Sequence, residues 1–195
     1  FVTNNPVMHI YDPLLAYNDD DKMEPQPALA KSYEVDGKDF ILTLRDDVVF
    51  HDGNEMTADD VVKSIEFLQS EEAASPVAWM YDNLDTLEQT GEYEVTFTLS
   101  QKDAVFRYVL CTNAAAVTSA VALEEGIDQK QNPVGAGPFK FEEWESGSYV
   151  LTSRFEDYYD DPYPYLDEIR WRVISNGTTR VTGLKNGSVG MSNRI

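Results

Sequence analysis

A short stretch rich in glycine and proline, Pro133 to Trp144, constrains the fold of this chain more than any other part of the sequence. Gly135 and Gly137 can adopt positive φ at no steric cost, so they permit a tight turn. After the turn, Phe139 and Phe141 alternate with polar residues, which is the two-residue period of a half-buried strand. The stretch therefore predicts a turn that leads directly into a β-strand.

Two further strand patterns follow closely. Glu145 to Ser148 is typical of a hairpin turn, and Tyr149 to Arg154 is rich in β-branched and aromatic residues. After an acidic loop, Ile169 to Ile174 alternates again between apolar and polar residues. Three strand patterns so close together in the chain indicate the centre of a β-sheet.

Two β-hairpins are predicted earlier in the chain, over residues 33–45 and 84–99. In both, apolar and polar residues alternate on either side of a glycine turn, at Gly37 and at Gly91. Short strands are expected over 14–17 and 48–50, and the prolines at 25 and 27 are interpreted as a linker.

A helix start is predicted at Thr57. The Thr57 side chain can cap the amides of the first turn, while Asp59 and Asp60 suit the positive end of the helix dipole. Apolar residues spaced three and four apart carry this helix to about Ser70. Shorter helices are predicted over 6–11, 106–110, 119–125 and 178–185. Strands interspersed with single helices favour a mixed α/β architecture of the α+β class.

The charge balance argues against two classes of partner. There are 35 Asp and Glu residues against 15 Lys and Arg, a formal net charge of −20. Nucleic acids and anionic membrane surfaces both require clustered basic residues, so a solvated acidic surface is the simpler interpretation. Hydrophobic residues make up 42% of the chain, enough for a substantial core, and no apolar run approaches the ~18 residues that cross a bilayer.

The chain starts at Phe1, without a start methionine or the basic and apolar regions of a signal peptide. We interpret it as a fragment of a longer protein, so its targeting must be inferred from elsewhere.

No catalytic residue, metal site or cofactor is expected. The chain lacks a Gly-x-Ser-x-Gly elbow, a Walker loop and a His-Glu-x-x-His pair. His51 precedes the turn residues Asp52 and Gly53, where a bond to the backbone is favoured over a role as a base. His9 is interpreted as half-buried, and Cys111, the only cysteine, as a buried and inert thiol.

One acidic segment, Asp157 to Tyr165, contains four tyrosines. It lacks the ligand spacing and central glycine of a calcium loop. Its tyrosines could line a ligand site, but packing of the loop onto the sheet is the favoured interpretation.

Six motifs, in this order, resemble one family: the extracellular solute-binding proteins of peptide, dipeptide and nickel ABC transporters, family 5. The motifs are FILTLRDDVVFHDG (40–53), MTADDVVKS (56–64), YEVTFTL (93–99), PVGAGPF (133–139), PYLDEI (164–169) and LKNG (184–187). The chain departs from the family pattern at Ala136, where threonine is usual, and over 154–159 and 188–190.

The resemblance implies a lobe of the type II periplasmic-binding-protein kind. Members of this family have two lobes that close on a solute, and this chain corresponds to most of lobe I, without the second lobe. Residues 1–33 and 133–195 would form parts of a central-sheet subdomain, and residues 34–132 an inserted α+β subdomain.

The resemblance also implies a function: capture of an oligopeptide or similar small solute outside the membrane and its delivery to an ABC permease. Such a protein is expected to be monomeric and periplasmic or extracellular, either secreted or lipid-anchored, and not an enzyme. By analogy, the residues expected to contact the solute are Thr3, Asn4, Asn5, Trp79, Met80, Tyr81, Thr112, Asn113 and Ala114. The alternatives are an interaction module without transport, or a hydrolase whose catalytic residues the motifs do not reveal.

Overall fold

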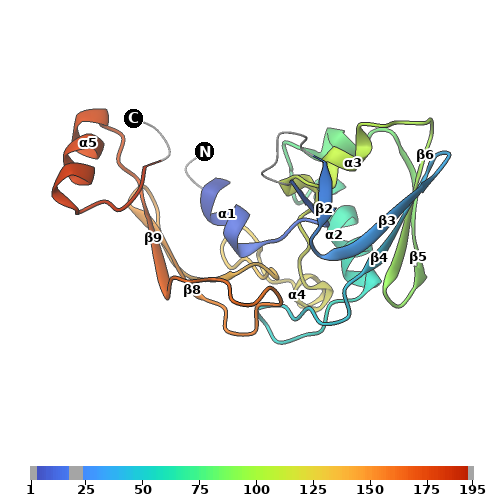
Figure 1. Ribbon diagram of the computed structural model, residues 1–195, viewed down its shortest axis with the longest axis horizontal. Coiled ribbons are helices and arrows are strands. Elements are labelled where there is room, and N and C mark those ends of the chain that lie inside the picture. The colour runs from blue at the N-terminus through green and yellow to red at the C-terminus, as the bar shows by residue number, and fades with distance from the viewer. Residues whose placement is uncertain (1–3, 18–23, 193–195) are drawn as a thin grey trace.

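The computed structural model describes residues 4–17 and 24–192, in which there are three antiparallel sheets: one of four strands, one of three and a small one of two (Figure 1). A three-stranded sheet and helix α1 lie on the left of Figure 1, and a four-stranded sheet and helix α2 lie on the right. The mixed α/β architecture of the α+β class is confirmed. No helix in the described part of the chain is long and apolar enough to span a membrane.

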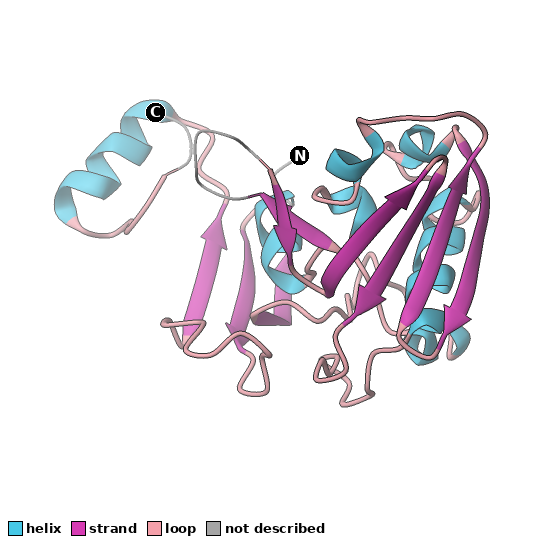
Figure 2. Cartoon of the chain, turned by 45° about the vertical axis from the view of Figure 1, so that its right-hand side comes forward, coloured by secondary structure: helices cyan, strands magenta, loops and turns pink. Residues whose placement is uncertain are grey.

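The larger sheet has the strand order β3-β4-β6-β5, and all its neighbours are antiparallel. Its strands are β3 (Ala30–Asp36), β4 (Asp39–Leu44), β5 (Leu84–Gly91) and β6 (Glu94–Leu99). Alternate residues of β4 and β6 are buried, because a strand turns successive side chains to opposite faces. Figure 2 shows these four strands with helices against one face, where most of the core lies. Both predicted hairpins are confirmed.

Helix α2 (Ala58–Gln69) begins at the predicted residue, but Asp60 makes contacts that the pattern did not reveal. One oxygen of its buried carboxylate accepts hydrogen bonds from the Thr57 amide (2.7 Å) and the Thr57 hydroxyl (3.0 Å). The other oxygen accepts from the Ala120 amide (2.8 Å), at the start of helix α4 (Ala120–Glu124). Asp60 therefore joins two helices as well as completing a helix start.

Replacing Asp60 with alanine is expected to lower the free energy of unfolding by about 2 kcal/mol, because three donors lose a buried acceptor. Urea denaturation measures this loss. The matched control is Asp59→Ala, which removes a partly exposed ion pair with Lys63 and a favourable first-turn charge but no buried acceptor, and should cost at most about 1 kcal/mol. Equal losses in the two variants would contradict this account of Asp60.

The smaller sheet has the order β7-β8-β9 and confirms the three consecutive strands predicted after Pro133. Its strands are β7 (Phe139–Glu145), β8 (Tyr149–Arg154) and β9 (Glu168–Arg172). Helix α1 (Asn4–Ile10) packs against β7 and β8, and His9 on α1 stacks on Trp171 of β9 with 4.9 Å between ring centroids. One face of this sheet is therefore covered by the N-terminal helix.

Two sequence interpretations were wrong. The proline linker is strand β2 (Pro25–Pro27), which pairs with β1 (Leu15–Tyr17). Prolines are tolerated there because this small sheet has only two strands and so leaves an edge that needs no amide donor. The strand expected over 48–50 makes only an isolated bridge, from Val49 to Glu55, because the chain turns back at once and the Phe50 amide bonds to the Asn54 carbonyl.

Helices α3 (Phe106–Val109) and α5 (Gly177–Asn186) agree in place with the predictions. The 3₁₀ turn η1 (Ala78–Tyr81) lies in a segment expected to be a loop or a short helix, and the 3₁₀ turn η2 (Asn113–Ala115) was not predicted. Helix α5 ends at Gly187, whose φ of 76° is the left-handed conformation expected of a terminating glycine.

The two glycines of the Pro133–Trp144 stretch serve a different purpose from the one predicted. Neither is among the residues with positive φ. Instead, a Cβ atom on Gly135 would lie 2.2 Å from the Ile10 carbonyl oxygen, and one on Gly137 would lie 2.6 Å from the His9 carbonyl oxygen. Glycine is needed here because the end of α1 passes directly against this backbone.

Candidate ligand-binding surface

The residues predicted to contact a solute lie in three segments. Thr3 lies outside the described residues, Asn4 begins helix α1, and Asn5 is exposed on its first turn. The other six residues lie on or next to η1 and η2, which are about thirty positions apart in the chain.

The structure brings the η1 and η2 segments together. The Tyr81 hydroxyl donates a hydrogen bond to the Ala114 carbonyl (3.0 Å), and the Thr112 hydroxyl lies 4.0 Å from the Met80 sulfur. The Thr112 hydroxyl also accepts from the Ala114 amide (3.2 Å), which closes the start of η2. We call the resulting surface, formed by residues 79–81 and 112–114, the η1–η2 patch.

The six residues of the η1–η2 patch differ in how much surface they offer. Trp79 is 63% exposed. By contrast, Tyr81 is only 1% exposed, and Ala114 is fully buried. Met80, Thr112 and Asn113 are half-buried. Tyr81 therefore does not present the ligand-contacting surface that was expected of it.

Tyr81 instead supports the patch from below. Its ring packs edge-on against Phe106, with 6.0 Å between centroids, and Phe106 in turn contacts Phe40 and Phe97 of the larger sheet. Burial also raises the pKa of the Tyr81 hydroxyl, so it stays protonated and keeps its bond to Ala114. The exposed indole of Trp79 thus lies next to a rigid aromatic core.

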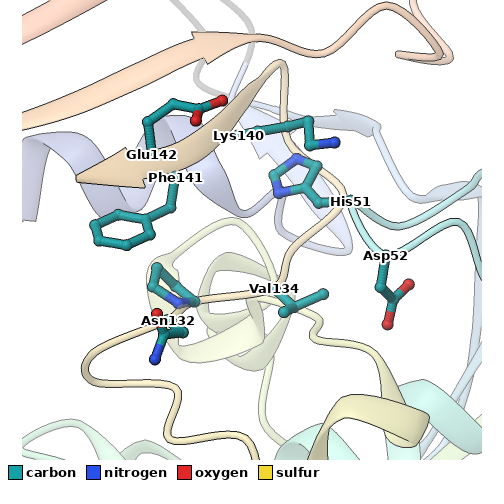
Figure 3. Close-up of a pocket in the computed structure, with 8 residues that line it drawn as sticks. His51, Asp52, Asn132, Val134, Lys140, Phe141 and Glu142 are labelled. Atoms are coloured by element: carbon teal, nitrogen blue, oxygen red, sulfur yellow. The ribbon is translucent and has the colours of Figure 1, made fainter.

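A separate hollow of about 270 Å³ lies where the His51 turn meets β7 (Figure 3). It is lined by His51, Asp52, Asn132, Pro133, Val134, Lys140, Phe141 and Glu142. The His51 Nε2–H donates to the Gly137 carbonyl (2.8 Å), which confirms the predicted bond to backbone. Burial lowers the pKa of His51 to about 4, so the ring is neutral near pH 7 and holds the glycine stretch in place.

The other reactive side chains are also packed. His9 stacks on Trp171, and burial lowers its pKa. Cys111 is buried, and burial raises the pKa of its thiol to about 11, which leaves little thiolate near pH 7. Among the described residues there is no group of three His, Cys, Asp or Glu side chains that could hold a metal ion.

Comparison with known proteins assigns the chain to a family. The family described as bacterial extracellular solute-binding proteins, family 5 Middle, matches residues 24–195. The chain is 33% identical over 183 residues to the oligopeptide-binding protein AppA of Bacillus subtilis, and the match covers 89% of this chain and 34% of AppA. It is 32% identical over 171 residues to the glutathione-binding protein GsiB of Salmonella typhimurium, covering 86% of this chain and 33% of GsiB. The chain thus spans about a third of the length of these relatives.

Solved structures of binding proteins share the fold of this chain. The protein AgaA from A. tumefaciens R10, in complex with agropinic acid, superposes with a TM-score of 0.88 at 31% identity, covering 96% of this chain and 38% of AgaA. NikZ from Campylobacter jejuni, in complex with Ni(L-His), superposes with a TM-score of 0.82 at 28% identity, covering 92% of this chain and 36% of NikZ. AppA of B. subtilis, in complex with a nonapeptide, superposes with a TM-score of 0.80 at 30% identity, covering 93% of this chain and 37% of AppA. The fold is that of one part of these periplasmic binding proteins.

Proposed function

Because this chain belongs to the family 5 bacterial extracellular solute-binding proteins, we propose that it forms one wall of the solute site in the binding component of an ABC importer. The solute is an oligopeptide or a similar small molecule, captured outside the membrane without covalent chemistry and passed to a permease. The protein acts as a monomer and is secreted or lipid-anchored. Its relatives, named for oligopeptide and glutathione binding, support this class of cargo.

The observation that carries the proposal is the exposed indole of Trp79 on the η1–η2 patch. A large aromatic side chain that is 63% exposed beside a packed core gives broad contact at little cost in conformational entropy. Met80, Thr112 and Asn113 add a polarisable sulfur and two polar groups around it. This combination suits peptides of varied sequence, because it offers contact area and few directional bonds.

We propose that residues 1–33 and 133–195 belong to the central-sheet subdomain and residues 34–132 to an inserted subdomain. Strand β3 (Ala30–Asp36), which pairs with β4 on both sides of residue 33, crosses the first of these boundaries.

Trp79→Ala, made in the intact binding protein, is expected to weaken peptide binding about tenfold, equivalent to about 1.4 kcal/mol. Isothermal titration calorimetry with a panel of defined pentapeptides measures this change. The matched control is Val35→Ala on β3, another exposed apolar residue, which should leave the affinity unchanged.

Equal affinities for wild type and the Trp79 variant would remove the η1–η2 patch from the solute site. Peptide hydrolysis during the titration would contradict a purely binding function. Recovery of a protein partner, with no small solute bound, would favour the interaction module.

A further inference from the structure

A second hollow, of about 220 Å³, lies where the loop after β8 meets the β1–β2 sheet and the end of β4. We call it the Asp12 cavity. It is lined by Asp12, Pro13, Ala16, Pro27, Ala28, Arg45, Tyr158, Tyr159 and Asp160. The residues come from four separate segments, and two of the tyrosines from the acidic loop singled out in the sequence are among them.

Asp12 is the central polar group of this cavity. The hydroxyls of Tyr158 and Tyr159 both donate to the same carboxylate oxygen, Oδ2, at 2.8 Å each. Burial raises the pKa of Asp12 to about 6; the tyrosine bonds lower it, and the charge of Asp160 raises it further. Asp12 is therefore largely ionised at pH 7 but uncharged at pH 5.

The charges around the cavity favour a cation. Arg45 also lines it, but its guanidinium is held by Asp47 through two hydrogen bonds (2.8 and 2.6 Å) and lies over the Tyr159 ring. Within the described residues, no ion pair joins Asp12 or Asp160 to a basic side chain. Because Asp47 already pairs with Arg45, the carboxyl groups of Asp12 and Asp160 are the acidic groups of the lining without a basic partner.

The shape limits the size of that cation. The cavity holds roughly seven water molecules at ~30 Å³ each, which is enough for a short alkyl chain and too little for a peptide. Pro13, Ala16 and Ala28 give a small apolar wall, while the face of Tyr159 is already covered by the Arg45 guanidinium. Asp160 is exposed, so the cavity opens to solvent on its side.

We propose that the Asp12 cavity is a binding site for a small primary amine, with the ammonium group between Asp12 and Asp160 and the alkyl chain against the alanine and proline wall. The site is separate from the η1–η2 patch and does not depend on the proposed transport function. Binding releases a proton below pH 6, because the ammonium group requires the ionised form of Asp12.

Calorimetry with n-butylamine at 150 mM NaCl tests the proposal. We expect one site per chain and an affinity about tenfold weaker at pH 5 than at pH 7, because about nine in ten Asp12 groups are protonated at pH 5. Titrations at pH 5.5 in buffers of different ionisation enthalpy should report proton release on binding. No saturable binding at pH 7, or an affinity that does not change with pH, would overturn the proposal.

Three variants identify the site. Asp12→Asn should weaken binding at pH 7 at least tenfold and abolish the pH dependence, while Asp160→Asn, at the exposed rim, should weaken binding several-fold. Glu88→Gln removes an exposed carboxylate on β5 and should have no effect. Equal weakening by Glu88→Gln would show that the amine follows the overall negative charge and not this cavity. The rim variant keeps the test valid if Asp12→Asn folds poorly.

Discussion

Replacing Gly135 with alanine is expected to lower the free energy of unfolding by about 3 kcal/mol, the upper end of the cost of overpacking a core. The new methyl carbon would lie 2.2 Å from the Ile10 carbonyl oxygen and 2.6 Å from Cδ1 of Tyr11. The Ile10 contact is with backbone, which cannot rotate away as a flexible side chain could.

The surrounding hydrogen bonds leave little room for adjustment. The Gly135 carbonyl accepts from the His51 amide (2.9 Å), and the Ile10 carbonyl accepts from the Gly137 amide (2.9 Å). Moving α1 away to admit a methyl group would strain the bond between Gly137 and Ile10. Moving the glycine stretch away would instead strain the bond to His51 and the bridge between Gly135 and Thr118.

Urea denaturation of Gly135→Ala against wild type measures the cost. The matched control is Gly190→Ala, since a Cβ at this exposed position meets nothing within 4 Å and its φ is not positive. The control should stay within about 0.5 kcal/mol of wild type. An unchanged unfolding midpoint for Gly135→Ala would contradict the close approach of the two backbones.

The pH dependence of stability is the second large effect, and it comes from two half-buried groups whose contributions have opposite signs. The pKa of Asp12 rises from 3.8 to about 6 on folding. Its contribution is therefore fully present below pH 3.8 and is lost as the pH rises through 6. The pKa of His51 falls from 6.5 to about 4, so its contribution is present above pH 6.5 and is lost as the pH falls towards 4.

Since one pKa unit is worth about 1.4 kcal/mol, each of these two groups changes the free energy of unfolding by about 3 kcal/mol across its window. Because the two windows overlap between pH 4 and 6, their slopes cancel in the wild type. Asp12→Asn should expose the His51 slope, with stability rising between pH 4 and 6.5 relative to wild type. His51→Gln, which retains a donor for the Gly137 carbonyl, should expose the opposite slope.

Urea midpoints measured at half-unit steps from pH 4 to 7 give these differences directly. Subtracting the wild-type profile removes the contribution of the many surface carboxylates, which is common to all three proteins. Parallel profiles for wild type and both variants would show that neither group changes its pKa on folding.

Much of the local structure could be predicted because it depends on neighbouring residues. The alternation of β4 and β6, the turn at Gly37 and the start of α2 at Thr57 all follow from the geometry of a few consecutive positions. The family motifs could also be recognised from the sequence, because each is a short run of adjacent residues.

The candidate site was predicted less completely. The two segments of the η1–η2 patch were both named, but their contact through Tyr81 and Ala114 joins residues 33 positions apart. No local pattern distinguishes the buried ring of Tyr81 from the exposed ring of Trp79, since both are aromatic residues in one short turn. Only packing against Phe106 determines which of them is buried.

The amino-acid sequence by itself determined the antiparallel strands after Pro133, the helix at Thr57 and membership of a solute-binding family. The tertiary structure alone decided why Gly135 must be glycine, and that Asp12 meets Tyr158 and Tyr159 nearly 150 positions away. The physical reason is the range of the interactions. Backbone periodicity is set by neighbours along the chain, whereas steric contact, burial and pKa depend on segments that only the folded chain brings together.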